Sequence, residues 1–177
     1  VVLPIICAFV GPAWDLLDPF RTLHDLGAAA LRRVGVVGWQ TAEYPARLGH
    51  WPAVIGFFVF VWLELVLQVA RAGRPLAMIA FAYTLFTLVM MAQFGRDTWR
   101  TRGETFTVWY HTVGRLAPLA WVRGEEGRRV RRRPFGAGLL EEGWGTARLV
   151  LVAFATGSIL YDGLSQTQIW FDLFGTP

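Results

Sequence analysis

Apolar residues in this chain gather into long runs that short charged blocks separate. The runs at 52–70 and 76–94 are each about as long as the roughly 20 residues that a helix needs to cross a bilayer. A third run, at 146–164, has the same character. This separation predicts an integral membrane protein, because a charged side chain at the bilayer centre costs at least about 2.5–3.5 kcal/mol on insertion scales.

A shorter apolar run occupies residues 1–13 and ends at Gly11-Pro12. It is too short to span a bilayer, which takes about 20 residues. We expect it to be the second half of a membrane helix, and we expect the chain to lack an upstream portion. Together with the three longer runs, it predicts an all-α integral membrane protein with about three to four transmembrane helices in a single domain, residues 1–177.

Two other segments predict amphipathic helices at the membrane surface. In 18–33, leucine and alanine recur at helical spacing among aspartate and arginine, and Asp18-Pro19 is a typical helix start. The segment 104–118 is too short and too polar for a simple span. An interfacial or re-entrant helix fits that segment better.

Arginine determines the predicted orientation, since all 17 basic residues are arginine. The loop 15–51 carries four arginines and the loop 95–145 carries ten, against two in the turn at 71–75. The excess of positive charge in loops 15–51 and 95–145 predicts that both are cytoplasmic, in a cell inner membrane. Because these arginines flank apolar segments, we interpret them as topology signals rather than as a nucleic-acid patch. The expected partners are the lipid bilayer and other membrane subunits.

Three polar side chains inside the predicted spans are candidates for function: Glu64, Tyr83 and Asp162. The helical rise of about 1.5 Å per residue places all three in the outer half of the bilayer. An intramembrane carboxyl is by default a functional-site hypothesis, here a proton or cation site. The structural alternative is a neutral Glu64 that is hydrogen-bonded to Tyr83, with Asp162 reaching the outer headgroups.

Helical spacing also predicts which way Glu64 points. Steps of three and four residues share a helix face. One such stripe holds the two polar residues of its span and consists of Phe57, Val61, Glu64 and Gln68. We predict that this stripe faces protein, because an ionised glutamate in lipid costs several kcal/mol with nothing to offset it. The nearest partners by depth are Tyr83 and Asp162.

A second set of polar residues lies at the inner edge of the predicted bilayer. Its members are His50, Gln93, Arg96, His111 and Arg115. His50 precedes an apolar run, where it could hold a pigment or a haem iron, although a histidine at a membrane boundary is more often a plain interface residue. Lipid is the cofactor that we expect. Motifs of serine, zinc, haem-attachment and nucleotide sites are missing from the sequence, so we predict neither catalytic nor metal-binding residues.

Three passages resemble a known family: LGHWPAVIGFFVFVWLELV at 48–66, GETFTVWYHTVGRLAPL at 103–119 and GSILYDGLSQTQIW at 157–170. They are similar to bacterial and archaeal multi-spanning membrane proteins that are often labelled the membrane component of a fenitrothion hydrolase. The resemblance implies a longer protein at both ends, and it implies that Glu64, Arg115 and Asp162 belong to family motifs. The label implies organophosphate hydrolysis, for which three scattered histidines make no binuclear metal site.

Three functions are therefore open. The first is a non-catalytic integral membrane subunit of a larger electron-transfer, photosynthetic or transport assembly. The second is a transporter-like protein that uses Glu64 and Asp162 and needs further helices to enclose a path. The third, from the resemblance alone, is a membrane component of an organophosphate hydrolase. The sequence favours the first and leaves enzymatic activity undecided, with the balance against it.

Overall fold

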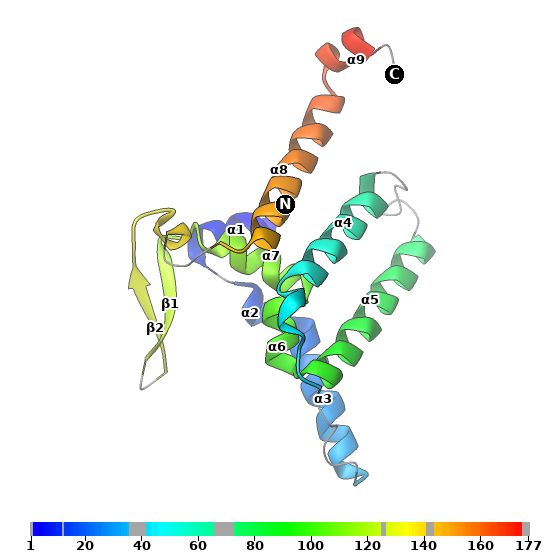
Figure 1. Cartoon of the computed structure of the whole chain (residues 1–177), viewed down its shortest axis with the longest axis vertical. Coiled ribbons are helices and arrows are strands. Elements are labelled where there is room, and N and C mark those ends of the chain that lie inside the picture. Colours follow the sequence, from blue (N-terminus) through cyan, green and yellow to red (C-terminus); the bar gives the residue numbers. More distant parts are fainter. Residues whose placement is uncertain are drawn as a thin grey trace.

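The computed structural model describes residues 2–11, 13–35, 42–65, 73–124, 127–140 and 144–174 and is mostly helical (Figure 1). In chain order the helices are α1 (Val2–Val10), α2 (Trp14–Leu17), α3 (Pro19–Arg33), α4 (Trp51–Leu65), α5 (Gly73–Phe94), α6 (Arg96–Arg102), α7 (Thr105–Gly114), α8 (Thr146–Ser165) and α9 (Gln168–Phe174). Short 3₁₀ turns lie at Ala46–Leu48 and Ala137–Leu139. Strands β1 (Leu119–Gly124) and β2 (Gly127–Arg132) lie between α7 and α8.

Two of the described helices are long and apolar enough to cross a membrane, α5 with 22 residues and α8 with 20. They correspond to the runs predicted at 76–94 and 146–164, so the prediction of long apolar helices there is confirmed. The run at 52–70 forms α4 as far as Leu65, and its residues 66–70 lie outside the described part of the chain. Within the run at 1–13, the described helix is the short α1, which ends at Val10. The next residue, Gly11, has a positive φ of 100°.

Helix α7, in the segment 104–118 for which the sequence predicts an interfacial or re-entrant helix, is the centre of the packing. Helices α1, α2, α4 and α6 all contact it (Figure 1). Five of its ten residues are buried: Thr105, Thr107, Val108, Thr112 and Gly114. The sequence prediction rested on Glu104, His111 and Arg115. The helix also holds threonines with small side chains that fit between helices, and Thr112 Oγ1 donates to the Val108 carbonyl at 2.7 Å.

A β-hairpin corrects the all-α prediction. β1 and β2 pair antiparallel, with Leu119 opposite Arg132 and Trp121 opposite Val130. Figure 1 shows the hairpin projecting away from α4 and α5. The sequence prediction treated this arginine-rich stretch as a loop because it lacks the apolar alternation of a half-buried strand. Two signals in the sequence favour a hairpin there. The β-branched valines favour strands, and the glycines at 124 and 127 favour a turn between them.

One apolar core joins α4, α7 and α8. The stripe of α4 that faces it contains Ala53, Val54, Phe57 and Val61, as expected for residues three and four apart. Helix α8 contributes Ala147, Leu151 and Ala155. Beyond Ala155 the large apolar residues of α8 are exposed, and Figure 1 shows this half of the helix extending past the rest of the fold.

A second core joins α3, α5 and α6 through Phe20, Met91 and Trp99. Helix α3 begins where the sequence predicted, with Pro19 in its first turn and Asp18 as its N-cap. The rest of the described chain covers its leucines only in part. Leu23 and Leu26 are 43% and 64% exposed, while Phe20 is 7% exposed. The apolar stripe of α3 is therefore left open.

Helices α4 and α7 approach closely at Gly56. A Cβ added to Gly56 would lie 2.1 Å from Thr105 Oγ1. We predict that Gly56→Leu destabilises the chain by about 1–3 kcal/mol, the typical cost of overpacking. Gly157→Leu on α8 is the matched control, because a Cβ there meets nothing within 4 Å. Thermal unfolding in detergent measures both variants, and equal melting temperatures would contradict the close approach.

Candidate functional site

A buried arginine joins α6 to the segment that contains α2 and α3. Arg100 is 7% exposed. Its Nε donates to Asp18 Oδ2 at 2.5 Å and its Nη2 donates to Asp15 Oδ1 at 3.1 Å. Asp18 also caps α3, since its Oδ1 accepts from the backbone N–H groups of Phe20 and Arg21 at 3.0 and 3.2 Å. The Asp18 carboxylate thus caps the N-terminus of α3 and also pairs with the buried guanidinium of Arg100.

The same group of charges reaches α7. His111 Nε2 lies 3.0 Å from Asp15 Oδ1. One turn earlier on α7, Thr107 Oγ1 accepts a hydrogen bond from Trp14 Nε1 at 3.0 Å. We refer to Asp15, Asp18, Arg100 and His111 as the Arg100 cluster. Taking charges out of water costs several kcal/mol per ion, so the cluster depends on keeping its hydrogen bonds complete. The Arg100 cluster therefore holds α2 and α3 in contact with α6 and α7.

Glu104 is a second buried carboxyl, 1% exposed, and it is the N-cap of α7. Its Oε1 accepts from the Phe106 N–H at 3.0 Å and its Oε2 from the Thr107 N–H at 2.6 Å. The Tyr83 hydroxyl, from α5, donates to Glu104 Oε1 at 2.5 Å. A negative charge is favoured at a helix N-terminus, so this position suits a carboxylate.

Tyr83 bonds to Glu104 and not to Glu64, the partner that the structural alternative from the sequence offers. Glu64 is exposed, and its carboxyl makes neither a hydrogen bond nor an ion pair with the described residues. Phe57 and Val61 of the predicted stripe are buried, but the protein surface that they contact does not reach Glu64. Gln68, the last residue of that stripe, lies outside the described residues.

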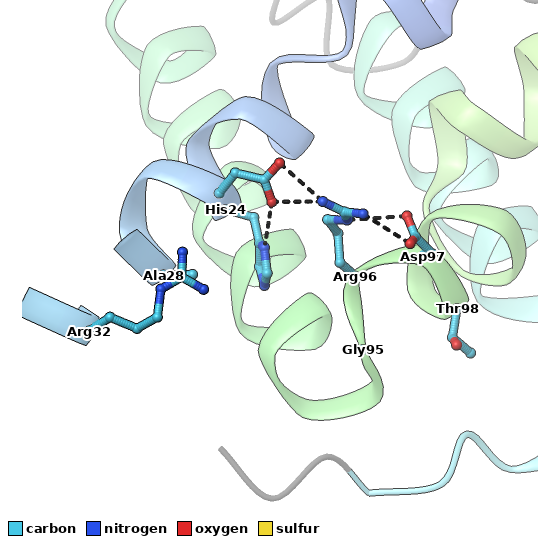
Figure 2. Close-up of a pocket in the computed structure, with 8 residues that line it drawn as sticks. His24, Ala28, Arg32, Gly95, Arg96, Asp97 and Thr98 are labelled. Atoms are coloured by element: carbon cyan, nitrogen blue, oxygen red, sulfur yellow. Dashed lines mark hydrogen bonds and ion pairs between the residues drawn. The ribbon is translucent and has the colours of Figure 1, made fainter. Parts of the chain in front are cut away.

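A groove of about 620 Å³ lies between α3 and the start of α6 (Figure 2). Its lining is His24, Asp25, Ala28, Arg32, Gly95, Arg96, Asp97 and Thr98. Arg96, an inner-edge candidate, donates to Asp25 at 2.8 Å and to Asp97 at 3.0 Å. The groove thus presents cations and carboxylates side by side, and most of them are already paired.

Arg96 controls the ionisation of both carboxyls. Its hydrogen bonds hold the pKa of Asp97 below the usual value. Burial raises the pKa of Asp25. The hydrogen bonds from Arg96 and His24 lower it, and together with the charges of the same two residues they outweigh burial, so the pKa of Asp25 lies below its usual value. Both aspartates are therefore ionised at neutral pH. These side chains are largely exposed, so the pairs contribute little to stability.

His50 lies among arginines rather than beside a metal-ligand set. Arg148 Nη2 donates to His50 Nε2 at 3.1 Å, which requires the neutral ring because an arginine can only donate. Burial lowers the pKa of His50, and the charges of Arg148, Arg102 and Arg115 lower it further. His50 is thus a neutral acceptor at pH 7.

This shift has a predicted effect on stability. Since the folded pKa lies below the unfolded value of about 6.5, the unfolded chain binds more protons, and stability falls as the pH drops below about 6.5. We expect His50→Gln to lose that part of the pH dependence and to unfold with a flatter profile between about pH 7 and 5. Thermal unfolding at several pH values measures this, and superimposable profiles of the two proteins would contradict it.

The other predicted residues have separate places. Asp162 is exposed, and its Oδ1 accepts from Gln166 Nε2 at 3.2 Å on the same stretch of chain. Gln93 is exposed and contributes its backbone carbonyl, which accepts from the Ala42 N–H at 2.7 Å. The Arg115 guanidinium lies 5.5 Å from the ring centre of Trp144. Of the predicted set, Tyr83 contacts the buried carboxyl of Glu104, and His111 contacts the partly buried carboxyl of Asp15.

Sequence reasoning missed the residues that form the buried polar contacts: Asp15, Arg100 and Glu104. The signal for Glu104 was weak, because a negative charge is favoured near a helix N-terminus but glutamate is not among the preferred N-cap residues. Arg100 gave no such signal, since an arginine in a charged block usually faces solvent. Among the described residues, no group of three or more histidine, cysteine, aspartate or glutamate side chains is placed to hold a metal ion.

Comparison of the chain with protein-family models, with curated proteins and with solved structures found no match.

Proposed function

We propose that this chain is a non-catalytic integral membrane subunit of a larger membrane assembly. The carrying observation is α8. Its first half packs on α4 through Leu151 and Ala155, whereas beyond them Ile159 and Leu160 are 66% and 65% exposed. Burying one such side chain is favourable by about 1.5–3 kcal/mol relative to leaving it in water. A helix of this length and composition therefore needs lipid or partner helices around it.

The open faces of α3 and α5 support the same proposal. On α5, Met78 and Phe81 are 72% and 71% exposed, a pattern that suits acyl chains or other helices. The open leucine stripe of α3, with arginines at both ends of the helix, suits the membrane interface. In this arrangement the arginine-rich loops 15–51 and 95–145 lie on the cytoplasmic side of the inner membrane.

The buried polar groups also favour a structural role. The Arg100 cluster and the Glu104–Tyr83 pair connect helices of the same chain, and α7 stands between them. Transport through Glu64 and Asp162 has less support, because both carboxyls are exposed in separate surroundings. Hydrolysis of organophosphates is a proposal that rests on the family resemblance alone.

Cross-linking in native membranes tests the proposed function. The chain has a single cysteine, the buried Cys7, so a Cys7→Ser background allows one new thiol at a time. With Ile159→Cys, we expect a bifunctional cross-linker to give one adduct of defined mass that contains a second polypeptide. Ala155→Cys, buried against α4, is the matched control and should give none.

The same membranes supply a second measurement. The chain should resist extraction by alkaline carbonate, and in mild detergent it should elute with its cross-linked partner. Release by carbonate would contradict membrane insertion. Elution at the mass of the single chain, together with an unmodified Ile159→Cys thiol, would contradict the subunit proposal.

A further inference from the structure

Thr167 fixes the turn between α8 and α9. Its backbone N–H and its hydroxyl both donate to the Leu164 carbonyl, at 3.0 and 2.7 Å, and these bonds close the last turn of α8. Its own carbonyl accepts from the N–H groups of Trp170 and Phe171 at 3.1 and 3.3 Å, where α9 begins. Figure 1 shows α9 turning away from the axis of α8 at the far end of that helix. Local bonds in the chain therefore set the direction of α9.

Helix α9 has a narrow polar face and a wide apolar one. Gln168 and Asp172 are four positions apart and share a face, and Gln168 Nε2 donates to Asp172 Oδ1 at 3.2 Å. The other five residues of α9 are apolar: Ile169, Trp170, Phe171, Leu173 and Phe174. Of these, Ile169 and Leu173 are 64% and 72% exposed. The described chain thus leaves most of this apolar face uncovered.

Aromatic and polar side chains gather where α8 meets α9. The Trp170 ring packs edge to face on Tyr161 of α8, with their ring centres 5.6 Å apart, and it lies 4.3 Å from the Phe174 ring. At the same end of α8, Asp162 and Gln166 are exposed and bonded to each other. Tryptophan and tyrosine have an apolar body and a polar tip, so they concentrate where lipid meets water. This composition is typical of a membrane surface.

The length of α8 gives the depth of α9. Its 20 residues span about 30 Å at about 1.5 Å per residue, close to the thickness of the hydrocarbon core. Between Arg148 in its first turn and Asp162 near its end there is no charged residue. When α8 begins at the cytoplasmic surface, its end reaches the opposite surface. Residues 149–174 contain no basic side chain, which fits the non-cytoplasmic side.

We propose that α9 lies in the non-cytoplasmic surface of the membrane, with its apolar face in the lipid and with Gln168 and Asp172 toward water. This inference rests on the proposed function, since it requires α8 to cross the bilayer. It adds a second contact surface whose partner is phospholipid. Because α9 carries an acidic residue and no basic one, its binding depends on apolar area and not on anionic headgroups. Such an anchor fixes how deeply α8 is inserted.

A fluorophore on a single cysteine tests this placement in the full chain. In the Cys7→Ser background, Ile169→Cys and Asp172→Cys put the label on opposite faces of α9, and both positions are exposed, so no core is disturbed. Phe81→Cys is the reference, because Phe81 is 71% exposed in the middle part of α5. The protein is reconstituted in phosphatidylcholine vesicles. The quenchers are iodide on both sides of the bilayer and lipids that carry a nitroxide near the headgroup or near the chain end.

We expect the two faces of α9 to respond differently. The Ile169 label should lose more fluorescence to the headgroup nitroxide than to the chain-end nitroxide, and little to iodide. The Asp172 label should be quenched mainly by iodide. The Phe81 label should respond most to the chain-end nitroxide. Replacing part of the phosphatidylcholine with phosphatidylglycerol should leave the Ile169 signal unchanged.

The outcomes separate this inference from the proposed function. Equal quenching of both α9 labels by iodide would overturn the lipid contact of α9, while lipid quenching at Phe81 would leave membrane insertion supported. An Ile169 label protected from every quencher would also overturn it, because protein would then cover that face. A Phe81 label that only iodide reaches would contradict insertion itself, and the placement of α9 would fail with it.

Discussion

Replacing Arg100 with leucine is expected to destabilise the chain by about 3–5 kcal/mol, the cost of leaving a buried charge without its partner. The reason is the position of Asp18, whose carboxylate is 1% exposed and lies 2.5 Å from Arg100 Nε. Unfolding in detergent, followed by circular dichroism, measures the loss. Arg132→Leu on β2 is the control, because that arginine is exposed and its replacement should change stability by less than about 0.5 kcal/mol.

A second substitution separates charge from packing at this site. Asparagine caps a helix about as well as aspartate does, so Asp18→Asn keeps the N-cap of α3 while it removes the charge. In the Arg100→Leu background, Asp18→Asn should therefore restore part of the lost stability. If the double variant is less stable than Arg100→Leu alone, the unpaired carboxylate is not the cause of the loss.

Glu104→Ala is expected to cost about 2–4 kcal/mol. Loss of an N-cap accounts for about 0.5–2 kcal/mol, and leaving the buried Tyr83 hydroxyl without its acceptor adds about 1–3 kcal/mol. Tyr83→Phe alone should cost less, because the cap of α7 stays intact. The two changes together should cost less than their sum, since they remove the same hydrogen bond.

Glu43→Ala is the control for Glu104→Ala, because it also removes a glutamate side chain but from an exposed position. Thermal melting in detergent compares the variants. A Glu104→Ala protein as stable as Glu43→Ala would contradict the buried cap. Strict additivity of Glu104→Ala and Tyr83→Phe would contradict the hydrogen bond between them.

The apolar helices could be predicted from local sequence patterns. Long apolar runs indicated α5 and α8 to within a few residues, and Asp18-Pro19 indicated the start of α3. These features are local, since a helix depends on residues three and four apart and on the groups at its ends. The same reasoning placed Phe57 and Val61 of α4 against protein, but it was wrong for Glu64 of the same stripe, which is exposed. Whether these helices enter a membrane remains a proposal.

Only the tertiary structure decided which polar groups meet. The helical rise places Tyr83 and Glu64 at similar depth on neighbouring helices, so the sequence offers a hydrogen bond between them as one alternative. Tyr83 bonds to Glu104 instead, because α7 packs in the centre and brings its own N-cap to α5. Arg100 and Asp15 lie 85 positions apart in the chain. Periodicity gives the direction in which a side chain leaves its own helix, whereas the identity of its partner depends on how distant helices pack, and that information is not local.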